Sequence, residues 1–284
     1  MTVQEASYLL INKLKSIYDE NESRTIAEMV MENTTGSPRV ERMKNKNLIL
    51  TEKEENKLNN YIERLLKNEP IQYILNEAWF GGFKFFVDEN VLIPRPETDE
   101  LVEWVVTDCR FPISELSILD IGTGSGCIPV TLKRRLRKAN VYTCDISEAA
   151  LLVAKKNAAI MNVDIQFFCL DILQTTNWPL LPVVDIIISN PPYIPIKDKA
   201  TIEANVLAYE PHTALFVQDN DPLLFYKAIA VFGKTHLKPS GTIYCEIHES
   251  MGDAVAKLFN ANGYQCLLKQ DMQGKTRMVK ATFE

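Results

Sequence analysis

Apolar residues recur at helical spacing in the first 75 residues, where no alternating run predicts a strand. The positions that carry this period are Tyr8, Leu9, Leu14 and Ile17, and then Leu58, Tyr61, Ile62, Leu65 and Leu66. Thr51, with Glu54 three residues later, has the form of a capping box that begins the last of these helices. The pattern predicts a small all-α domain over residues 1–75.

The pattern changes at Trp79, from which aromatic and β-branched residues run to Ile93 with Gly81 and Gly82 between them. Such a run broken by glycines predicts a β-hairpin, and we assign residues 76–95 as a hairpin linker between two domains. Prolines at 94 and 96 end the strand. A helix is predicted over 98–106, with Leu101, Val102 and Val105 on one face.

Beyond residue 115, short apolar runs alternate with helical segments. The predicted strands are Ile118–Ile121, Val141–Asp145, Ile165–Leu170, Val184–Ser189 and Gly241–Ile247, with two more around Cys266 and Met278. The predicted helices are Gly126–Arg137, Ser147–Met161 and a segment near Leu223–His236. This alternation predicts an α/β domain over residues 96–284, in which helices cover both faces of a parallel sheet.

Composition and charge narrow the function classes. The chain has 284 residues, of which 46% are hydrophobic and 24% charged, and its net charge is −6. The acidic balance opposes non-specific attraction to nucleic-acid phosphates, and the basic residues at 133–138 are typical of a solvated helix end. No apolar stretch approaches the roughly 20 residues of a membrane span, and the N-terminus lacks a signal-peptide layout. We therefore expect a soluble cytoplasmic protein without a membrane partner.

Metal binding is not expected from the cysteines and histidines. The six cysteines contain no Cys-x-x-Cys pair, several lie in apolar runs, and the three histidines are scattered. Buried structural thiols explain this pattern better than zinc ligands do.

A glycine-rich turn follows the first predicted strand of the α/β domain. It contains Asp120, Ile121, Gly122, Thr123, Gly124, Ser125 and Gly126. Glycine turns of this kind also hold dinucleotides or simply connect a strand tightly to a helix. Asp145 ends the second strand, 19 residues after Gly126, where a carboxylate can accept hydrogen bonds from both hydroxyls of a ribose. The turn and the acid together predict a nucleoside ligand.

A second acid, Asp171, follows the third strand and precedes Ile172. There it can accept from an adenine amino group while Ile172 packs on the ring. An ordinary surface aspartate remains the alternative for this position.

The most specific motif is Asn190-Pro191-Pro192-Tyr193, directly after the apolar strand Val184–Ser189. This position is the carboxyl edge of the sheet, where such folds bind ligands. The prolines restrict the turn, so the Asn190 side-chain oxygen and the Pro191 carbonyl can converge as two acceptors. Such a pair matches the two hydrogens of a planar amino group, against which Tyr193 can stack.

This arrangement suits methyl transfer to a poor nucleophile. The lone pair of an amide or exocyclic amine is delocalised, and accepting both hydrogens favours the pyramidal form that exists near the transition state. A methyl group carried on a sulfonium is already activated, so no metal or strong base is required.

The residues resemble the N5-glutamine methyltransferases that act on peptide chain release factors. The resemblance covers nearly the whole chain and includes a linker motif that generic methyltransferases lack. The matching segments are Glu69–Ile74, Phe80–Val87, Val91–Thr98, Glu210 with Pro211, and Leu215. The chain departs from the family at His248, where glycine is usual, and at Met251, where glutamine is common.

The resemblance implies a Rossmann-like class I methyltransferase sheet behind a helical domain that recognises class 1 release factors. It implies that the enzyme, an S-adenosylmethionine-dependent protein-(glutamine-N5) methyltransferase, modifies the glutamine of their Gly-Gly-Gln motif and releases S-adenosylhomocysteine. The cofactor-binding residues predicted from the motifs and the resemblance are Gly122, Thr123, Gly124, Ser125, Gly126, Asp145, Asp171, Ile172 and Asn190. The predicted substrate-binding residues are Asn190, Pro191, Pro192 and Tyr193, of which Asn190, Pro191 and Tyr193 are also assigned as catalytic.

Two other functions remain open. A nucleic-acid methyltransferase acting on the exocyclic N6 amine of adenine poses the same geometric problem, and the same turn solves it. A non-catalytic protein that kept the fold is the third possibility. The acidic charge and the linker motif favour a protein acceptor without direct nucleic-acid binding.

Overall fold

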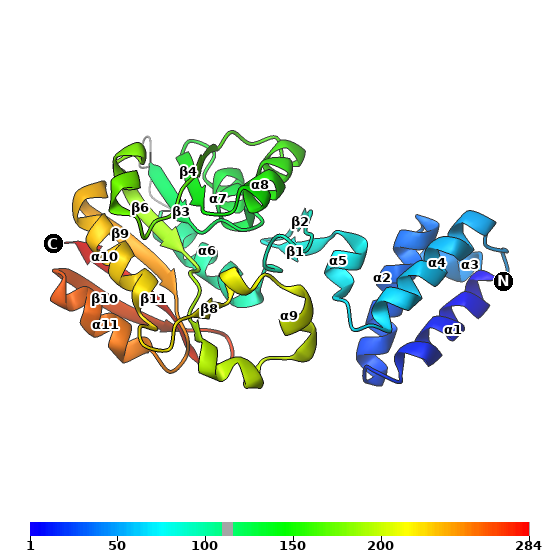
Figure 1. Ribbon diagram of the computed structural model, residues 1–284. Helices are drawn as coiled ribbons and strands as arrows, with labels where there is room; N and C mark the ends of the chain where they lie inside the picture. The colour runs from blue at the N-terminus through cyan, green and yellow to red at the C-terminus, as the bar shows by residue number, and fades with distance from the viewer. Residues whose placement is uncertain (110–115, 284) are drawn as a thin grey trace. The chain divides into compact units, whose positions relative to one another are not determined.

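The computed structural model describes residues 1–109 and 116–283 (Figure 1). These residues form two compact units. The first comprises Met1–Glu77 with Glu203–Tyr209, and the second comprises the described residues of Ala78–Ile202 and Glu210–Glu284. Within the described ranges, no helix has the length and apolar character needed to cross a membrane.

The first unit is helical. Its helices are α1 (Val3–Leu14), α2 (Glu20–Thr35), α3 (Arg39–Lys44), α4 (Glu52–Leu65), α5 (Ile71–Leu75) and α9 (Ala204–Tyr209). The predicted capping box begins α4, where the Thr51 hydroxyl accepts from the Glu54 N–H and the Glu54 carboxylate accepts from the Thr51 N–H. The Tyr209 hydroxyl donates to the Lys67 carbonyl at 2.8 Å, which ties α9 to this unit.

The apolar face of α1 differs from the predicted one. Its buried residues are Val3, Ala6, Leu10 and Leu14, whereas Tyr8 is 60% exposed and Ile17 lies beyond the end of the helix. The stripe that begins at Val3 recurs every three or four residues, and Tyr8 falls outside that stripe.

A short hairpin opens the second unit. Strand β1 (Ala78–Phe80) pairs antiparallel with β2 (Phe83–Phe85), and Gly81 and Gly82 form the turn with φ of 58° and 77°. Positive φ at both central residues is the requirement of a two-residue turn that matches strand twist. The hairpin ends at Phe85, so it is shorter than the predicted run to Ile93. Directly after the hairpin, the Asn157 side chain fixes the main chain at Phe86. Its oxygen accepts from the Phe86 N–H and its nitrogen donates to the Phe86 carbonyl.

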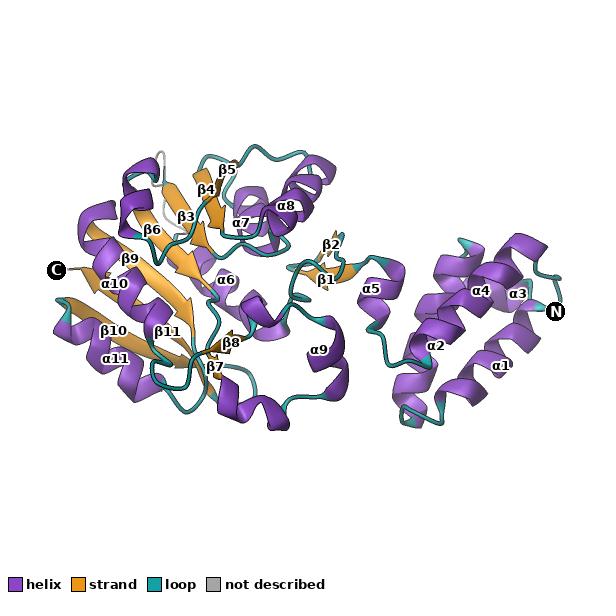
Figure 2. Ribbon diagram, viewed as in Figure 1, coloured by secondary structure: helices purple, strands orange, loops and turns teal. Residues whose placement is uncertain are grey.

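The second unit is built on a seven-stranded sheet, as far as the structure describes it, with the order β10-β11-β9-β6-β3-β4-β5 (Figure 2). The strands are β3 (Ser117–Ile121), β4 (Asn140–Asp145), β5 (Gln166–Cys169), β6 (Val184–Ser189), β9 (Leu237–Glu246), β10 (Tyr264–Gln270) and β11 (Thr276–Phe283). The prediction of a parallel sheet is wrong for β11, which is antiparallel to both β9 and β10. The connection from Gln270 to Thr276 is too short for a crossover, and a short connection joins only antiparallel neighbours.

Helices cover both faces of the sheet, as predicted. The helices are α6 (Pro96–Asp108), α7 (Cys127–Arg135), α8 (Glu148–Ile160), α10 (Leu224–His236) and α11 (Gly252–Ala261), of which the sequence pattern did not predict α11. Ile118 and Ile186 pack into the core with α6 and α7, whereas their neighbours Leu119 and Ile187 pack into the core with α10 and α11. Adjacent residues of one strand therefore contribute to two separate cores, because side chains alternate between the two faces of a sheet.

The cysteines lie mostly where small apolar side chains are expected. Cys127, Cys144 and Cys245 are buried, but Cys169 is exposed at the end of β5. The interpretation of the cysteines as core thiols is therefore wrong for Cys169, because β5 is an edge strand of the sheet.

Candidate active site

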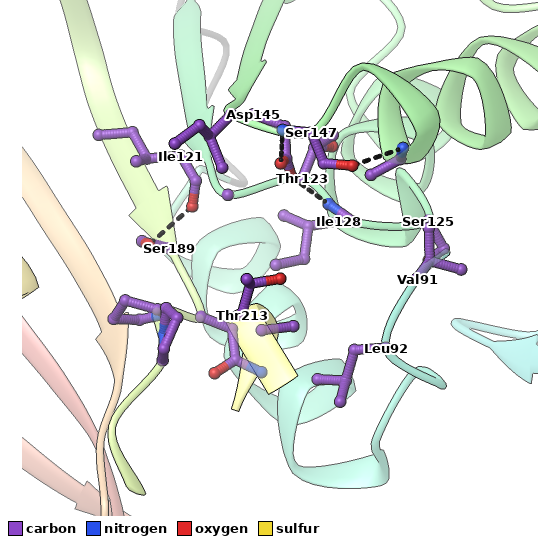
Figure 3. A pocket seen from close by; sticks show the side chains of 18 of the residues that line it. Val91, Leu92, Ile121, Thr123, Ser125, Ile128, Asp145, Ser147, Ser189 and Thr213 are labelled. Atoms are coloured by element: carbon purple, nitrogen blue, oxygen red, sulfur yellow. Dashed lines mark hydrogen bonds between the residues drawn. The ribbon is translucent and has the colours of Figure 1, made fainter. Parts of the chain in front are cut away.

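A pocket of about 150 Å³ lies at the carboxyl ends of β3, β4 and β6, entirely within the second unit. Its walls come from the glycine turn, the ends of β4 and β5, the Asn-Pro-Pro turn and the 90–98 segment. Figure 3 shows part of its lining, including Ser189 and Ile121 joined by a hydrogen bond of 2.7 Å. That bond links the ends of β6 and β3, from which the two predicted ligand-binding turns leave the sheet.

The three glycines of the turn serve two different purposes. Gly122 and Gly124 have φ of 80° and 51°, and a Cβ added to either would meet nothing within 4 Å, so both face open space. Gly126 has φ of 79°, and an added Cβ would lie 2.9 Å from the Cβ of Ala154. Gly122 and Gly124 therefore leave room for a ligand, whereas Gly126 allows α7 to pack against α8.

Asp145 stands beside this turn (Figure 3). One carboxylate oxygen accepts from the Gly124 N–H at 2.9 Å, and the other accepts from the Ser147 N–H at 2.9 Å. Burial raises the pKa of Asp145 and outweighs the lowering by these N–H groups. A carboxylate offers about four acceptor sites, so each oxygen can accept a further hydroxyl.

The next wall of the pocket combines an acid with apolar groups. Asp171 and Ile172 both line it, together with Leu170. The Asp171 carboxylate accepts from the Leu173 N–H at 2.9 Å, and the Trp178 indole donates to the Ile172 carbonyl at 2.8 Å. These bonds fix a loop that contributes a carboxylate and an aliphatic side chain to the same pocket.

The Asn-Pro-Pro-Tyr turn begins where β6 ends. Asn190, Pro191 and Pro192 line the pocket, and the Asn190 amide nitrogen donates to the Thr98 hydroxyl at 2.9 Å. The Tyr193 hydroxyl donates to Glu246 at 3.1 Å. Burial raises the pKa of Tyr193, so its hydroxyl stays protonated and acts as a donor.

Two residues of this site were missed by the sequence reasoning. Thr98, in the first turn of α6, and Glu246, the last residue of β9, are both buried and joined by a hydrogen bond of 2.5 Å. Burial raises the pKa of Glu246 to about 7. A charged residue that ends an apolar strand was the available signal.

A partly buried ion pair holds the linker against the pocket. Glu210, whose side chain is 1% exposed, accepts from the Arg95 guanidinium at 2.6 Å and from the Ile93 N–H at 3.1 Å. Both Arg95 and the neighbouring Pro94 line the pocket. The segment is therefore fixed by a charge from a distant part of the chain.

Most of the sequence-predicted site residues meet in this one pocket. Its lining includes Gly122, Thr123, Gly124, Ser125, Asp145, Asp171, Ile172, Asn190, Pro191 and Pro192. Gly126 and Tyr193 are not among the lining residues. Gly126 packs on α8, and Tyr193 turns its hydroxyl toward Glu246 behind the turn.

Comparison with known proteins follows the division of the chain. Residues 9–75 match the PrmC N-terminal domain, and residues 101–212 match the methyltransferase small domain. The release factor glutamine methyltransferase of Flavobacterium psychrophilum is 41% identical over 100% of both chains. The chain belongs to the release factor glutamine methyltransferase family. The enzyme of that name from Bacteroides thetaiotaomicron is 40% identical over 94% of this chain and 95% of its own.

A solved structure has the same fold as the second unit's methyltransferase sheet. A methyltransferase from Pyrococcus furiosus superposes with a TM-score of 0.51 at 17% identity, over 79% of this chain and 98% of its own. The likeness concerns the fold alone. Together with the family, it identifies the chain as a methyltransferase with a Rossmann-like catalytic sheet.

We expect Glu210→Ala to loosen the linker, because the Ile93 N–H loses a charged acceptor. Hydrogen bonds to charged groups contribute about 1.5–3 kcal/mol, so amide exchange at Ile93 should accelerate about 10- to 100-fold. Hydrogen-exchange mass spectrometry of the 90–98 segment measures this effect. Asp221→Ala, which removes a more exposed ion pair with Lys227, is the control and should leave that segment unchanged. Equal exchange rates in the Glu210→Ala variant and the unmodified protein would show that Glu210 does not hold the 90–98 segment in place.

Proposed function

We propose that this chain transfers the methyl group of S-adenosylmethionine to the side-chain amide nitrogen (N5) of the glutamine in the Gly-Gly-Gln motif of class 1 peptide chain release factors. S-adenosylhomocysteine is the second product. The observation that carries the proposal is the Asn-Pro-Pro turn in the wall of the pocket that also contains the glycine turn and Asp145. Membership of the family supports the choice of acceptor.

The pocket residues fit the proposed cofactor. The spare acceptor positions of Asp145 suit two ribose hydroxyls, and Ile172 with Asp171 suits an adenine ring and its amino group. Gly122 and Gly124 leave space beside the turn that side chains would fill. Bound there, S-adenosylmethionine supplies a methyl group already activated on a sulfonium, so the protein's task is to position and activate the acceptor.

The Asn-Pro-Pro turn performs that task on the glutamine. The Asn190 side-chain nitrogen donates to the Thr98 hydroxyl. The side-chain oxygen of Asn190 is therefore the atom that can accept a hydrogen bond from the amide of the substrate glutamine. The Pro191 carbonyl accepts the second hydrogen, and together they favour the pyramidal, nucleophilic nitrogen. With S-adenosylmethionine bound, the amide nitrogen would take the methyl group as the carbon–sulfur bond breaks and would then lose a proton to water, while the Asn190 oxygen and the Pro191 carbonyl hold the nitrogen in place.

We assign release-factor recognition to the helical domain of residues 1–75, which residues 76–95 join to the methyltransferase domain of residues 96–284. The first unit has its own apolar core around Leu10, Leu14 and Leu58, so it offers a stable surface. The Asn-Pro-Pro turn can bind any planar amino group, so selectivity for one substrate must come from contacts elsewhere on the protein. Binding energy from parts of the substrate remote from the glutamine supplies that selectivity. Activity on release factors places the enzyme in the cytoplasm.

Mass spectrometry of a release factor incubated with the full chain and isotopically labelled S-adenosylmethionine tests the proposed function. We expect one labelled methyl group on the glutamine of Gly-Gly-Gln and none on duplex DNA, ribosomal RNA or transfer RNA. A labelled adenine without labelled glutamine would instead establish the nucleic-acid alternative.

Asn190→Ala should reduce turnover by roughly 100-fold or more, as the loss of a preorganised polar group from an active site does. Turnover should fall far more than cofactor affinity, because the interaction that is removed acts mainly in the transition state. The measurements are single-turnover methylation and calorimetric titration of the cofactor. Near-normal turnover would refute the two-acceptor mechanism.

Asp145→Ala should weaken cofactor binding, because charge-assisted hydrogen bonds contribute about 1.5–3 kcal/mol each, or about 10- to 100-fold in Kd. Isothermal titration calorimetry measures the loss, and circular dichroism establishes that the variant is folded. Unchanged affinity in a folded variant would remove Asp145 from the ribose role.

A further inference from the structure

Three elements of the second unit converge behind Asn190. Strand β6 ends at Ser189, which pairs with Cys245 in the parallel register of β9. The next residues along the chain, Asn190 just after β6 and Glu246 at the end of β9, therefore lie side by side at this end of the sheet. Thr98, in the first turn of α6, lies between them and bonds to both.

The direction of these hydrogen bonds is fixed by chemistry. An ionised carboxylate can only accept, so the single hydrogen of the Thr98 hydroxyl is directed to Glu246 at 2.5 Å, a distance typical of a charge-assisted bond. The Thr98 oxygen then has only lone pairs left for Asn190. Asn190 must present its nitrogen to Thr98, at 2.9 Å, and its oxygen points elsewhere.

This constraint matters because the two ends of an amide have nearly the same shape. Without it, the Asn190 side chain can turn over and offer its NH₂ group where the mechanism needs an acceptor. An NH₂ group facing the amide hydrogens of the substrate would repel them.

The same carboxylate also holds the far end of the turn. Its second oxygen accepts from the Tyr193 hydroxyl at 3.1 Å, and Glu246 as a whole is only 2% exposed. A single buried charge thus fixes Tyr193 directly and Asn190 through Thr98.

We propose that Glu246 is a positioning residue, which sets the orientation of the Asn190 amide through Thr98 so that the asparagine oxygen faces the acceptor nitrogen. The inference rests on the proposed function, because it gives a reason for the orientation that the methylation mechanism requires. Nothing in it depends on which protein carries the acceptor amide.

The hydrogen bonds from Thr98 to Glu246 and from Asn190 to Thr98 form a relay. This relay orients Asn190 only while Glu246 is ionised. A protonated Glu246 can donate to Thr98, which then donates to the Asn190 oxygen and turns the amide over. The groups that face the carboxyl are Glu97 on α6, Tyr193 in the turn, Arg277 on β11 and, at the main-chain carbonyl, Tyr226 on α10. Burial raises the pKa of Glu246 to about 7, and Glu97 adds to this rise whereas Thr98, Tyr193 and Arg277 oppose it. Because the ionised form is the competent one, kcat should fall as pH falls through that value.

Substitution of Thr98 tests the relay without touching the charge. Thr98→Val keeps the shape but removes the hydroxyl. We expect kcat to fall on the order of 10- to 100-fold, the size of effect seen when the partners that orient metal ligands are mutated. Thr98→Ser keeps the hydroxyl and should retain most of kcat. Tyr264→Phe removes another buried hydroxyl, which donates to the Ala230 carbonyl at 2.8 Å away from the pocket, and should leave kcat unchanged. Wild-type kcat in Thr98→Val would overturn the proposal.

The pH profile of Glu246→Gln tests the charge itself. At saturating cofactor and release factor, the unmodified enzyme should lose kcat below about pH 7, whereas Glu246→Gln should be slower and lack this acid limb. An acid limb that persists in Glu246→Gln would overturn the proposal, and if that variant does not fold, the Thr98 pair decides. Mass spectrometry of the glutamine product in the same reactions separates the two ideas. Absence of labelled glutamine with the unmodified enzyme would refute the proposed function, whereas normal product with unaffected variants would refute only the positioning role.

Discussion

Parallel pairing of β3 with β4 on one side and β6 on the other is the constraint on which the site depends. It brings the carboxyl ends of three strands to one edge, although the residues that follow them are far apart in the sequence. The glycine turn, Asp145 and Asn190 lie together at that edge. The pairing itself is stabilised by two cores, because the strands carry mostly apolar side chains on both faces and helices cover each face.

Three buried or partly buried carboxylates then give this edge its fixed geometry. Asp145 holds the glycine turn through two N–H groups, Glu210 holds the linker, and Glu246 holds the Asn-Pro-Pro-Tyr turn. Each carboxylate accepts from two partners, which offsets the cost of taking a charge out of water. Loops that would otherwise move independently are in this way attached to the rigid sheet, as preorganised catalysis requires.

The sequence by itself predicted the local elements and the chemistry of the turns. Period and capping residues predicted α4, alternation predicted the layered sheet, and the order strand, glycine turn, helix placed Gly122 and Gly124 in the pocket. Asn190 and Pro191 were predicted as site residues because prolines restrict the backbone wherever they occur, and this restriction can be read from the sequence alone. These features depend on neighbours in the chain, so their signals are local.

Only the tertiary structure decided which distant residues hold these turns in place. Gly126 looks like its neighbours in the sequence, but the approach of Ala154 on α8 assigns it to packing. Thr98 and Glu246 are 148 positions apart, and nothing in either local pattern predicts their contact. The direction of the hydrogen-bond relay, and with it the orientation of Asn190, follows from the meeting of α6, β6 and β9. Pairing between segments so far apart is set by the packing of the whole sheet, which local sequence patterns do not specify.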